Sequence, residues 1–147
     1  VLRELDGPRR LPIWLGTNEA TSIVFALQGI EPPRPLTHDL LLAVVRELGR
    51  SITRVVVHTV EDTVFHAAIS FDDATVVDAR ASDALALAAR TGCPILCSSA
   101  VLDEAGLVLS PDGELREQAA ESPGGAEAQV REFRDFLDHV DPDDFQS

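Results

Sequence analysis

The chain of 147 residues contains no methionine, and only 5% of its side chains are aromatic. It also lacks any apolar run near the ~20 residues that span a bilayer, and its first residues do not form a signal peptide. We therefore expect a cytoplasmic protein with an aliphatic core, anchored by Trp14 and a few phenylalanines. Because no methionine precedes the apolar residues at Val1, we also expect the natural chain to begin earlier, with a further strand.

The chain also lacks an excess of positive charge, since its formal net charge is −13. This sign is opposite to the basic surface that drives non-specific binding to nucleic acid, so such binding requires a local basic patch or bridging metal ions. The chain has no glycine-rich phosphate loop, no Gly-x-Ser-x-Gly elbow and no His-Glu-x-x-His pair. These absences argue against the common NTPases, serine hydrolases and zincins.

Cysteine is scarce as well, with Cys93 and Cys97 on either side of Pro94-Ile95-Leu96. In an extended segment the two residues lie roughly 13 Å apart, beyond the ~7 Å between Cα atoms that a disulfide allows. We expect both to be reduced packing residues.

The first fifty residues predict a hairpin followed by two helices. The hairpin pairs residues 1–5 with residues 11–15 across a turn at Asp6-Gly7-Pro8. The first helix follows a cap at Thr17 or Asn18 and ends at Gly29. The second covers 38–48, with Thr37 as its cap, Gly49 as its stop and one apolar stripe, formed by Leu40, Leu41, Val44, Val45 and Leu48.

Residues 51–80 predict three antiparallel strands at 52–60, 63–71 and 74–80, because β-branched residues alternate with polar ones. Matching the apolar faces of the first two strands sets His58 opposite His66 on the other face. Such a pair can share a metal ion, but two ligands do not make a site.

The remaining chain predicts a helix at 83–90 capped by Ser82 and ended by Gly92, a short buried strand at 94–97 and a helix at 99–105. Residues 110–127 have the composition of a flexible linker. Residues 128–147 predict a C-terminal helix and an acidic tail. We therefore expect one α+β domain over 1–109, in which helices pack on a mixed, largely antiparallel sheet.

Two acidic helix starts carry the chemistry that the sequence offers. At the first, Asp78, Arg80, Ser82 and Asp83 lie where a strand turns into a helix, so free N–H groups and Arg80 can hold a phosphate. The same residues can equally be an ordinary capped helix start.

At the second helix start, His38 and Asp39 follow Thr37. They can serve as base and orienting group, or bind a divalent ion, only if Glu19, Asp78 or Asp83 converges on them. The alternative is that His38 is a partly buried hydrogen-bonding residue. The arginines at 3, 9, 10, 34 and 80 can form a local positive patch if the fold gathers them.

Three segments together resemble the bifunctional nuclease domain family, and the similarity extends from Val1 to about Gly106. They are Leu11-Pro12-Ile13-Trp14-Leu15-Gly16 followed by Glu19-Ala20, then Arg34-Pro35-Leu36-Thr37-His38-Asp39-Leu40, and Asp78-Ala79-Arg80-Ala81-Ser82-Asp83-Ala84. The tail is similar to that of actinobacterial members. Ala81 replaces the family's usual proline, whereas the polar groups around it match.

The resemblance implies an α+β fold, a homodimer and hydrolysis of both DNA and RNA. Its signature positions are Glu19, His38, Asp39, Asp78, Arg80, Ser82 and Asp83. We expect His38, Asp39, Asp78 and Asp83 to be catalytic, and Arg80 and Ser82, together with Arg34, to bind the substrate. Carboxylates at Glu19, Asp39, Asp78 and Asp83 are the ligands expected for Mg²⁺ or Mn²⁺, with His38 as general base. The alternatives are a non-catalytic regulatory domain that binds a ligand or protein in the same cleft, and a scaffold in which both motifs are helix caps.

Overall fold

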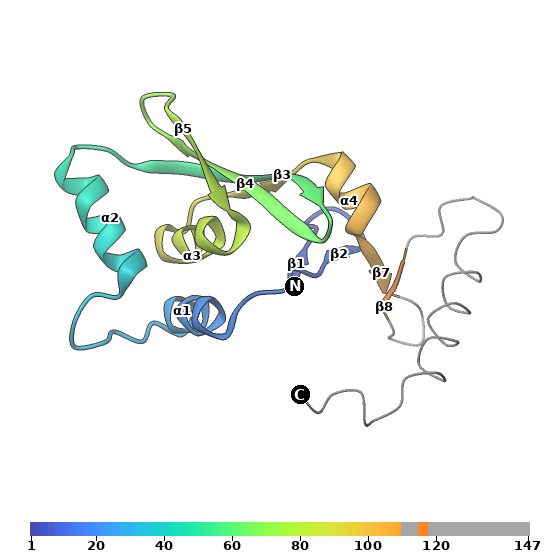
Figure 1. Cartoon of the computed structure of the whole chain (residues 1–147), viewed down its shortest axis with the longest axis horizontal. Coiled ribbons are helices and arrows are strands. Elements are labelled where there is room, and N and C mark those ends of the chain that lie inside the picture. The colour runs from blue at the N-terminus through green and yellow to red at the C-terminus, as the bar shows by residue number, and fades with distance from the viewer. Residues whose placement is uncertain (110–114, 118–147) are drawn as a thin grey trace, which may run out of the picture.

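The computed structural model describes residues 1–109 and 115–117, which form four helices and two four-stranded sheets (Figure 1). All strand pairs in these residues are antiparallel except β3 with β6, which confirms the expected α+β class. Each helix in this part of the chain is too short or too polar to cross a membrane.

The larger sheet has the order β5-β4-β3-β6, formed by Val76–Arg80, Val64–Phe71, Ile52–Glu61 and Ile95–Cys97. The strands at 52–80 therefore match the prediction closely. Their alternating apolar residues point to one face, where Val55, Val57 and Ala67 are fully buried. Helix α3 (Ala81–Thr91) packs on this face through its alanine-rich side.

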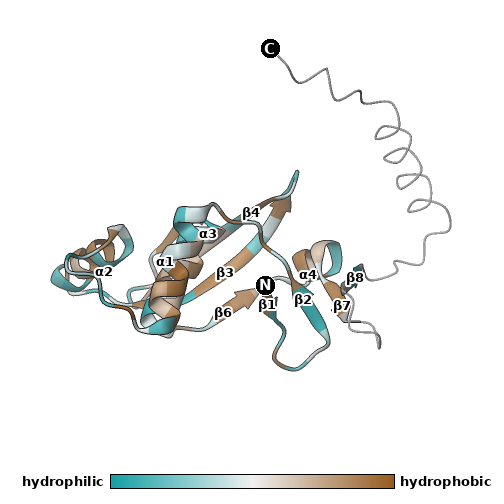
Figure 2. Cartoon of the chain, turned by 90° about the horizontal axis from the view of Figure 1, so that it is seen from below, coloured by the Kyte–Doolittle hydropathy of each residue, from teal (hydrophilic) through white to brown (hydrophobic). Residues whose placement is uncertain are grey.

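Helix α1 (Thr17–Gln28) packs on α3, so α3 lies between α1 and the sheet (Figure 1). Helix α2 (Thr37–Glu47) stands at one end of this layered body and buries only Leu42. The predicted apolar stripe is mostly exposed, at Leu40, Leu41, Val44 and Leu48. Figure 2 shows that α2 stands apart from the sheet. The stripe lies outside the core because α2 contacts α3 through its first turn, where His38 meets Asp83 and Asp39 meets Arg90.

The smaller sheet has the order β1-β2-β7-β8, formed by Leu2–Arg3, Arg9–Leu11, Leu107–Leu109 and Leu115–Glu117. Helix α4 (Ser99–Ala105) packs between the two sheets, in contact with β2 and β3. Strand β8 lies inside the segment 110–127 that we expected to be a linker, and these three residues pair with β7. The rest of that segment and the expected helix and tail at 128–147 lie outside the described residues.

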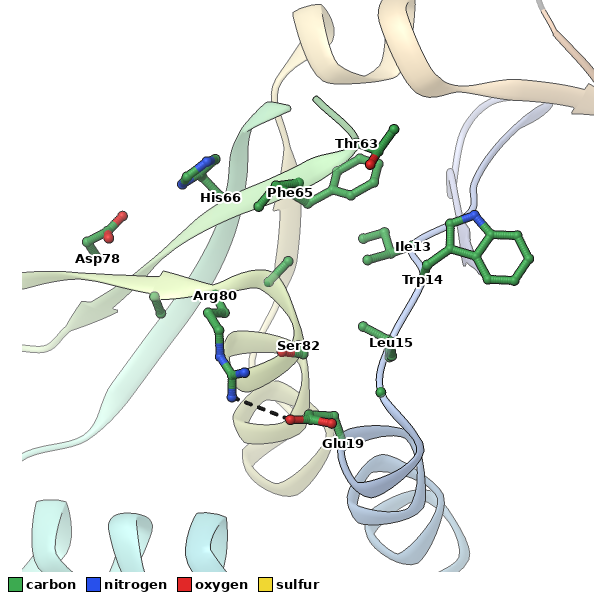
Figure 3. Close-up of a pocket in the computed structure, with 14 residues that line it drawn as sticks. Ile13, Trp14, Leu15, Glu19, Thr63, Phe65, His66, Asp78, Arg80 and Ser82 are labelled. Carbon is green, nitrogen blue, oxygen red and sulfur yellow. Dashed lines mark ion pairs between the residues drawn. The ribbon is translucent and has the colours of Figure 1, made fainter. Parts of the chain in front are cut away.

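The second strand of the hairpin ends at Leu11 rather than at residue 15, because Pro12 has no N–H group to continue the strand pairing. The chain then runs outside both sheets as far as α1. Trp14 lies in this segment and is 91% exposed, so the prediction that it anchors the core was wrong. In Figure 3 its indole points away from Phe65, whereas Ile13 points toward it.

Three helices begin at a residue whose own side chain does not cap the helix, although at the start of α2 the Leu36 N–H donates to Asp39 Oδ2 at 2.9 Å. The N-caps of α1, α2 and α3 are Gly16, Leu36 and Arg80, and none of them caps its helix with a side-chain hydrogen bond. The predictions of caps at Thr17 or Asn18, at Thr37 and at Ser82 were wrong, because each helix begins one or two residues earlier than expected. The glycine stops at residues 29 and 92 are confirmed, with left-handed φ angles of 64° and 70°.

A β-bulge separates the two sheet histidines. The pairing Val57↔Ala67 is as predicted, but the register then shifts so that Thr59, not His58, pairs with His66. His58 is therefore the extra residue of the bulge, and the predicted His58–His66 pair does not form.

The strand at Ile95–Cys97 is also more exposed than predicted, because β6 forms an edge of the larger sheet. Cys93, which precedes this strand, and Cys97, at its end, form no disulfide, as expected. Burial raises the pKa of the Cys97 thiol.

Candidate active site

The starts of α2 and α3 lie side by side and share a hydrogen bond. His38 Nε2 lies 3.1 Å from Asp83 Oδ1, and its other ring nitrogen, Nδ1, lies 3.0 Å from Ser22 Oγ on α1. Three helices therefore contribute one residue each to a continuous chain of polar atoms. Ser22 is the only buried residue that α1 provides, which places a hydroxyl group where an apolar side chain is usual.

Arg80 covers this chain from the solvent side. Its Nε donates to Asp83 Oδ2 at 2.7 Å and its Nη2 donates to Asp83 Oδ1 at 3.1 Å, a two-pronged pair. Nη2 also lies 3.6 Å from Glu19 Oε1 (Figure 3). Arg80 first, and His38 second, hold the pKa of Asp83 below its ordinary value, so Asp83 is a carboxylate at neutral pH.

On the inner side, Arg90 binds the Asp39 carboxylate as Arg80 binds Asp83, and the Arg90 side chain is 8% exposed. It donates from Nε to Asp39 Oδ1 at 2.6 Å, from Nη2 to Ser22 Oγ at 3.0 Å and from Nη1 to the Ala86 carbonyl at 3.0 Å. The Arg90 hydrogen bond is the main reason that the pKa of Asp39 is lowered. We call Glu19, Ser22, His38, Asp39, Arg80, Asp83 and Arg90 the inner cluster.

Two hollows open beside the inner cluster. An inner pocket of about 310 Å³ is lined by residues of α1, α2 and the α3 start, including Ser22, His38, Arg80 and Asp83. An outer groove of about 550 Å³ runs along β4, β5 and the segment before α1, and its polar walls include His66, Asp78 and Ser82 (Figure 3). Glu19 and Arg80 line both hollows and so form the wall between them.

The same region matches a known family. Residues 1–110 match the model of the bifunctional nuclease domain, which is three quarters of the chain. The chain belongs to the bifunctional nuclease domain family. It is also 45% identical over 147 residues to two proteins of Mycobacterium tuberculosis, "Uncharacterized protein MT1877" of strain CDC 1551 and "Uncharacterized protein Rv1829" of strain H37Rv, covering 100% of this chain and 87% of each relative. Membership suggests nuclease-like activity and nucleic-acid binding.

The signature residues of this bifunctional nuclease domain divide into two groups. His38, Asp83, Glu19 and Arg80 come together directly, and Asp39 joins them through Arg90. Asp78 and Ser82 face the outer groove instead; the Asp78 side chain is 83% exposed, and its Oδ1 lies 4.0 Å from His58 Nε2. Arg34 is exposed in the connection before α2 and lines neither hollow.

The carboxylates of the domain do not share a common point. Asp39 is bound by Arg90, Asp83 by Arg80 and His38, and Asp78 lies apart on β5. Within residues 1–109 and 115–117, no three His, Cys, Asp or Glu side chains converge as a metal site. This arrangement does not fit Mg²⁺ or Mn²⁺ unless an arginine moves, because both cations take several oxygen ligands at once. The metal requirement stays a prediction.

Sequence reasoning missed Ser22 and Arg90. Each lies on the same helix face as a residue that was recognised, since Ser22 is three positions after Glu19 and Arg90 is seven after Asp83. That spacing was the available signal. Ser22 was passed over because it begins an otherwise apolar run, and Arg90 because a basic residue near a helix end is favoured by the helix dipole alone.

Proposed function

We propose that this bifunctional nuclease domain hydrolyses phosphodiester bonds of DNA and RNA at the inner pocket. The observation that carries the proposal is that the starts of α2 and α3, where the N-cap side chain makes no hydrogen bond to the first-turn N–H groups, adjoin the hollows on either side of Arg80. Free N–H groups at helix starts and an arginine are the donors that bind phosphate oxygens. They supply local positive character in a chain whose net charge is −13.

His38 supplies the acid–base group of this proposal. It lies in the wall of the inner pocket, and its ring is oriented by Asp83 on one side and by Ser22 on the other. A histidine held in this way can take and return a proton during phosphoryl transfer. Arg80 is 67% exposed and within reach of an incoming phosphate, where its charge stabilises the transition state.

The outer groove suits the continuing nucleic-acid strand. It is lined on one side by Arg80 and His66 and meets the inner pocket at Arg80. A strand lying there places one phosphate at the pocket and the next nucleotides along β5 and the segment that carries Trp14. In this proposal Ser82 and Asp78 contact the strand, and Arg34 contributes at the pocket entrance only after the 29–36 connection moves.

The test is cleavage of end-labelled single-stranded DNA and RNA by the purified full chain. We expect cleavage by the wild type and a loss of about 100-fold or more in the His38→Ala and Asp83→Asn variants. Arg54→Ala is the matched control, because Arg54 is an exposed arginine on β3 outside both hollows. Unchanged turnover in both site variants would mean that the activity resides elsewhere.

The second candidate is a non-catalytic domain that binds an anionic ligand in the same pocket. The ion pairs favour it, because Asp83 and Asp39 are already neutralised by arginines and are not free to act. For this candidate, addition of a mononucleotide should raise the melting temperature of the protein. Incubation with DNA or RNA for hours should give no cleavage product.

We also propose that the domain forms the homodimer that the family resemblance implies. The exposed apolar side chains of α2 support it, since Leu48 is 73% exposed and Leu41 and Val44 lie on the same stripe. Light scattering after gel filtration tests this, with Leu48→Glu expected to give monomers and the exposed Val76→Glu on β5 as the control.

A further inference from the structure

The inner cluster contains a serine whose hydrogen bonds match those of an activated nucleophile. Ser22 Oγ lies 3.0 Å from His38 Nδ1, and His38 Nε2 lies 3.1 Å from Asp83 Oδ1. This is the order serine, histidine, aspartate found in triads on unrelated folds, which are recognised by geometry rather than sequence position. The two ring nitrogens are exchanged here, because Nδ1 faces the serine and Nε2 faces the aspartate. Here the serine lies on helix α1 and not on a strand-to-helix elbow, so a motif search cannot find it.

The direction of each hydrogen bond follows from the groups involved. The Asp83 carboxylate can only accept, so neutral His38 carries its proton on Nε2 and has a free electron pair on Nδ1. Arg90 can only donate, so Ser22 Oγ accepts from Arg90 and is left to donate its own hydrogen. The acceptor beside that hydrogen is His38 Nδ1. His38 is thus arranged to remove a proton from Ser22.

The neighbours of Ser22 also suit a serine that becomes negatively charged. Arg90 Nη2 lies 3.0 Å from the oxygen and stabilises an alkoxide. Ser22 is 7% exposed, so water competes little with these contacts, yet it lines the inner pocket together with Arg80 and the first turn of α2. One electron pair of the oxygen remains for attack after the Arg90 contact is made.

We propose that Ser22 is the nucleophile of this site and forms a covalent phosphoseryl intermediate with its substrate. The choice of a phosphodiester as substrate rests on the function proposed above; the activation of Ser22 does not. The geometry would equally serve another phosphoryl ester that fits a pocket of about 310 Å³.

The proposed reaction has two steps, transfer of the phosphoryl group to Ser22 and hydrolysis of the phosphoserine. Ser22 Oγ attacks phosphorus, its proton moves to His38 Nδ1, and the bond to the leaving oxygen breaks on the opposite side, where that oxygen takes a proton from solvent. Water then attacks from that opposite side and gives a proton to solvent. The Ser22–phosphorus bond breaks, and Ser22 recovers its proton from His38. The sum is one phosphodiester and one water giving a phosphomonoester and an alcohol.

The direct test is labelling with diisopropyl fluorophosphate, which phosphorylates an activated serine and releases fluoride. The full chain is incubated with the reagent, digested with trypsin and analysed by mass spectrometry. Ser22 is the only serine between Arg10 and Arg46, so an adduct on the peptide 11–46 is narrowed to Ser22 or to a threonine, and fragmentation distinguishes them. We expect one adduct, on Ser22.

Three variants complete the test. Ser22→Ala should form no adduct on this peptide. His38→Ala should be labelled at least about 100-fold more slowly than the wild type. Ser99→Ala, at an exposed serine at the start of α4, should label like the wild type. If Ser22→Ala fails to fold, the wild-type adduct and the His38→Ala rate still decide. Absence of a wild-type adduct on Ser22 overturns the proposal.

Nucleic-acid cleavage separates this inference from the proposed function. If the wild type cleaves DNA or RNA and folded Ser22→Ala cleaves at the same rate, the proposal that Ser22 is the nucleophile is wrong, whereas the proposed nuclease activity is supported. If the wild type is labelled on Ser22 but cleaves neither DNA nor RNA, the proposed nuclease activity is wrong, and Ser22 is a nucleophile for another phosphoryl ester. A loss of cleavage of about 100-fold in Ser22→Ala, with the KM for the strand unchanged, supports both.

Discussion

Asp83 and His38 are 45 positions apart in the chain, yet Asp83 Oδ1 lies 3.1 Å from His38 Nε2. This hydrogen bond joins the starts of α2 and α3, which the sequence presents as separate acidic motifs. Asp39, one residue after His38, does not share it. It binds Arg90 instead, and Arg90 returns to the same network through Ser22. The two motifs therefore form one site in which Asp39 and Asp83 each bind a different arginine.

Acid should weaken the fold through Asp83. Because the pKa of Asp83 is lowered in the folded protein, its contribution to the free energy of unfolding is present above the ordinary value of 3.8 and is lost as pH falls through the lowered value. Asp83→Asn should thus be less stable than the wild type at pH 7, and the difference should narrow below pH 3.8. Urea unfolding of both proteins at pH 7 and at pH 3 measures this difference.

The control for acid unfolding is Asp62→Asn, at an exposed turn residue with a positive φ that asparagine also adopts. It should stay within about 0.5 kcal/mol of the wild type at both pH values. A constant difference between Asp83→Asn and the wild type from pH 7 to pH 3 would contradict the ion-pair explanation.

Arg90 should be worth more to stability than any exposed arginine. Arg90→Gln removes hydrogen bonds to Asp39, Ser22 and the Ala86 carbonyl, and we expect a loss of about 2 kcal/mol in the free energy of unfolding. Arg90→Lys keeps the charge but cannot reach the three acceptors together, so it should recover only part of the loss.

Arg46→Gln, at an exposed arginine in the last turn of α2, is the control for Arg90. It should change stability by less than about 0.5 kcal/mol. Urea unfolding followed by circular dichroism compares all three variants, and equal midpoints for Arg90→Gln and the wild type would contradict the network.

Arg80 should contribute one phosphate contact. Arg80→Ala should weaken binding to a labelled single strand and lower the slope of log affinity against log salt by about 0.7, the value for one phosphate contact to a single strand. Fluorescence anisotropy between low and physiological salt measures both. Arg54→Ala, outside both hollows, should leave the slope unchanged; a fall of the same size in both variants would indicate general attraction only.

Divalent metal should affect the protein as well as its activity if it binds in the cluster. Such binding requires Arg80 or Arg90 to leave its carboxylate. In that case EDTA should abolish cleavage and Mn²⁺ should restore it, and Mn²⁺ alone should raise the melting temperature, because a ligand of the folded state stabilises it. Asp83→Asn should remove that shift. Full cleavage in EDTA would rule out the metal requirement, whereas restored cleavage without a thermal shift would place the ion on the nucleic acid.

Trp14 should matter little to stability despite its size. Its side chain is 91% exposed, so Trp14→Ala should change the free energy of unfolding by less than about 0.5 kcal/mol. Leu87→Ala, at a core residue that is 1% exposed, should cost about 2 to 5 kcal/mol. As the single tryptophan, Trp14 should also be quenched by acrylamide almost as fully in the native chain as in urea.

Much of the fold could be predicted because local patterns control it. The alternation at 52–80 predicts β3 to β5, and glycines at 29 and 92 end α1 and α3 in the left-handed conformation. The predictions that failed depend on what lies opposite each segment. The apolar stripe of α2 faces solvent because no sheet lies beside it. The bulge at His58 moves the core-facing side of β3 from Val57 to Val60, where strict alternation expects Thr59.

The sequence by itself therefore determined the α+β class, the main strands and helices, the family and most polar residues of the site. Only the tertiary structure decided how those residues are paired. Ser22, His38, Asp83 and Arg90 lie 16 to 68 positions apart where they bond, and periodicity states which face a residue occupies but not which distant residue it meets. Packing of α1 and α2 against α3 sets those distances, because hydrogen bonds form only within about 3 Å.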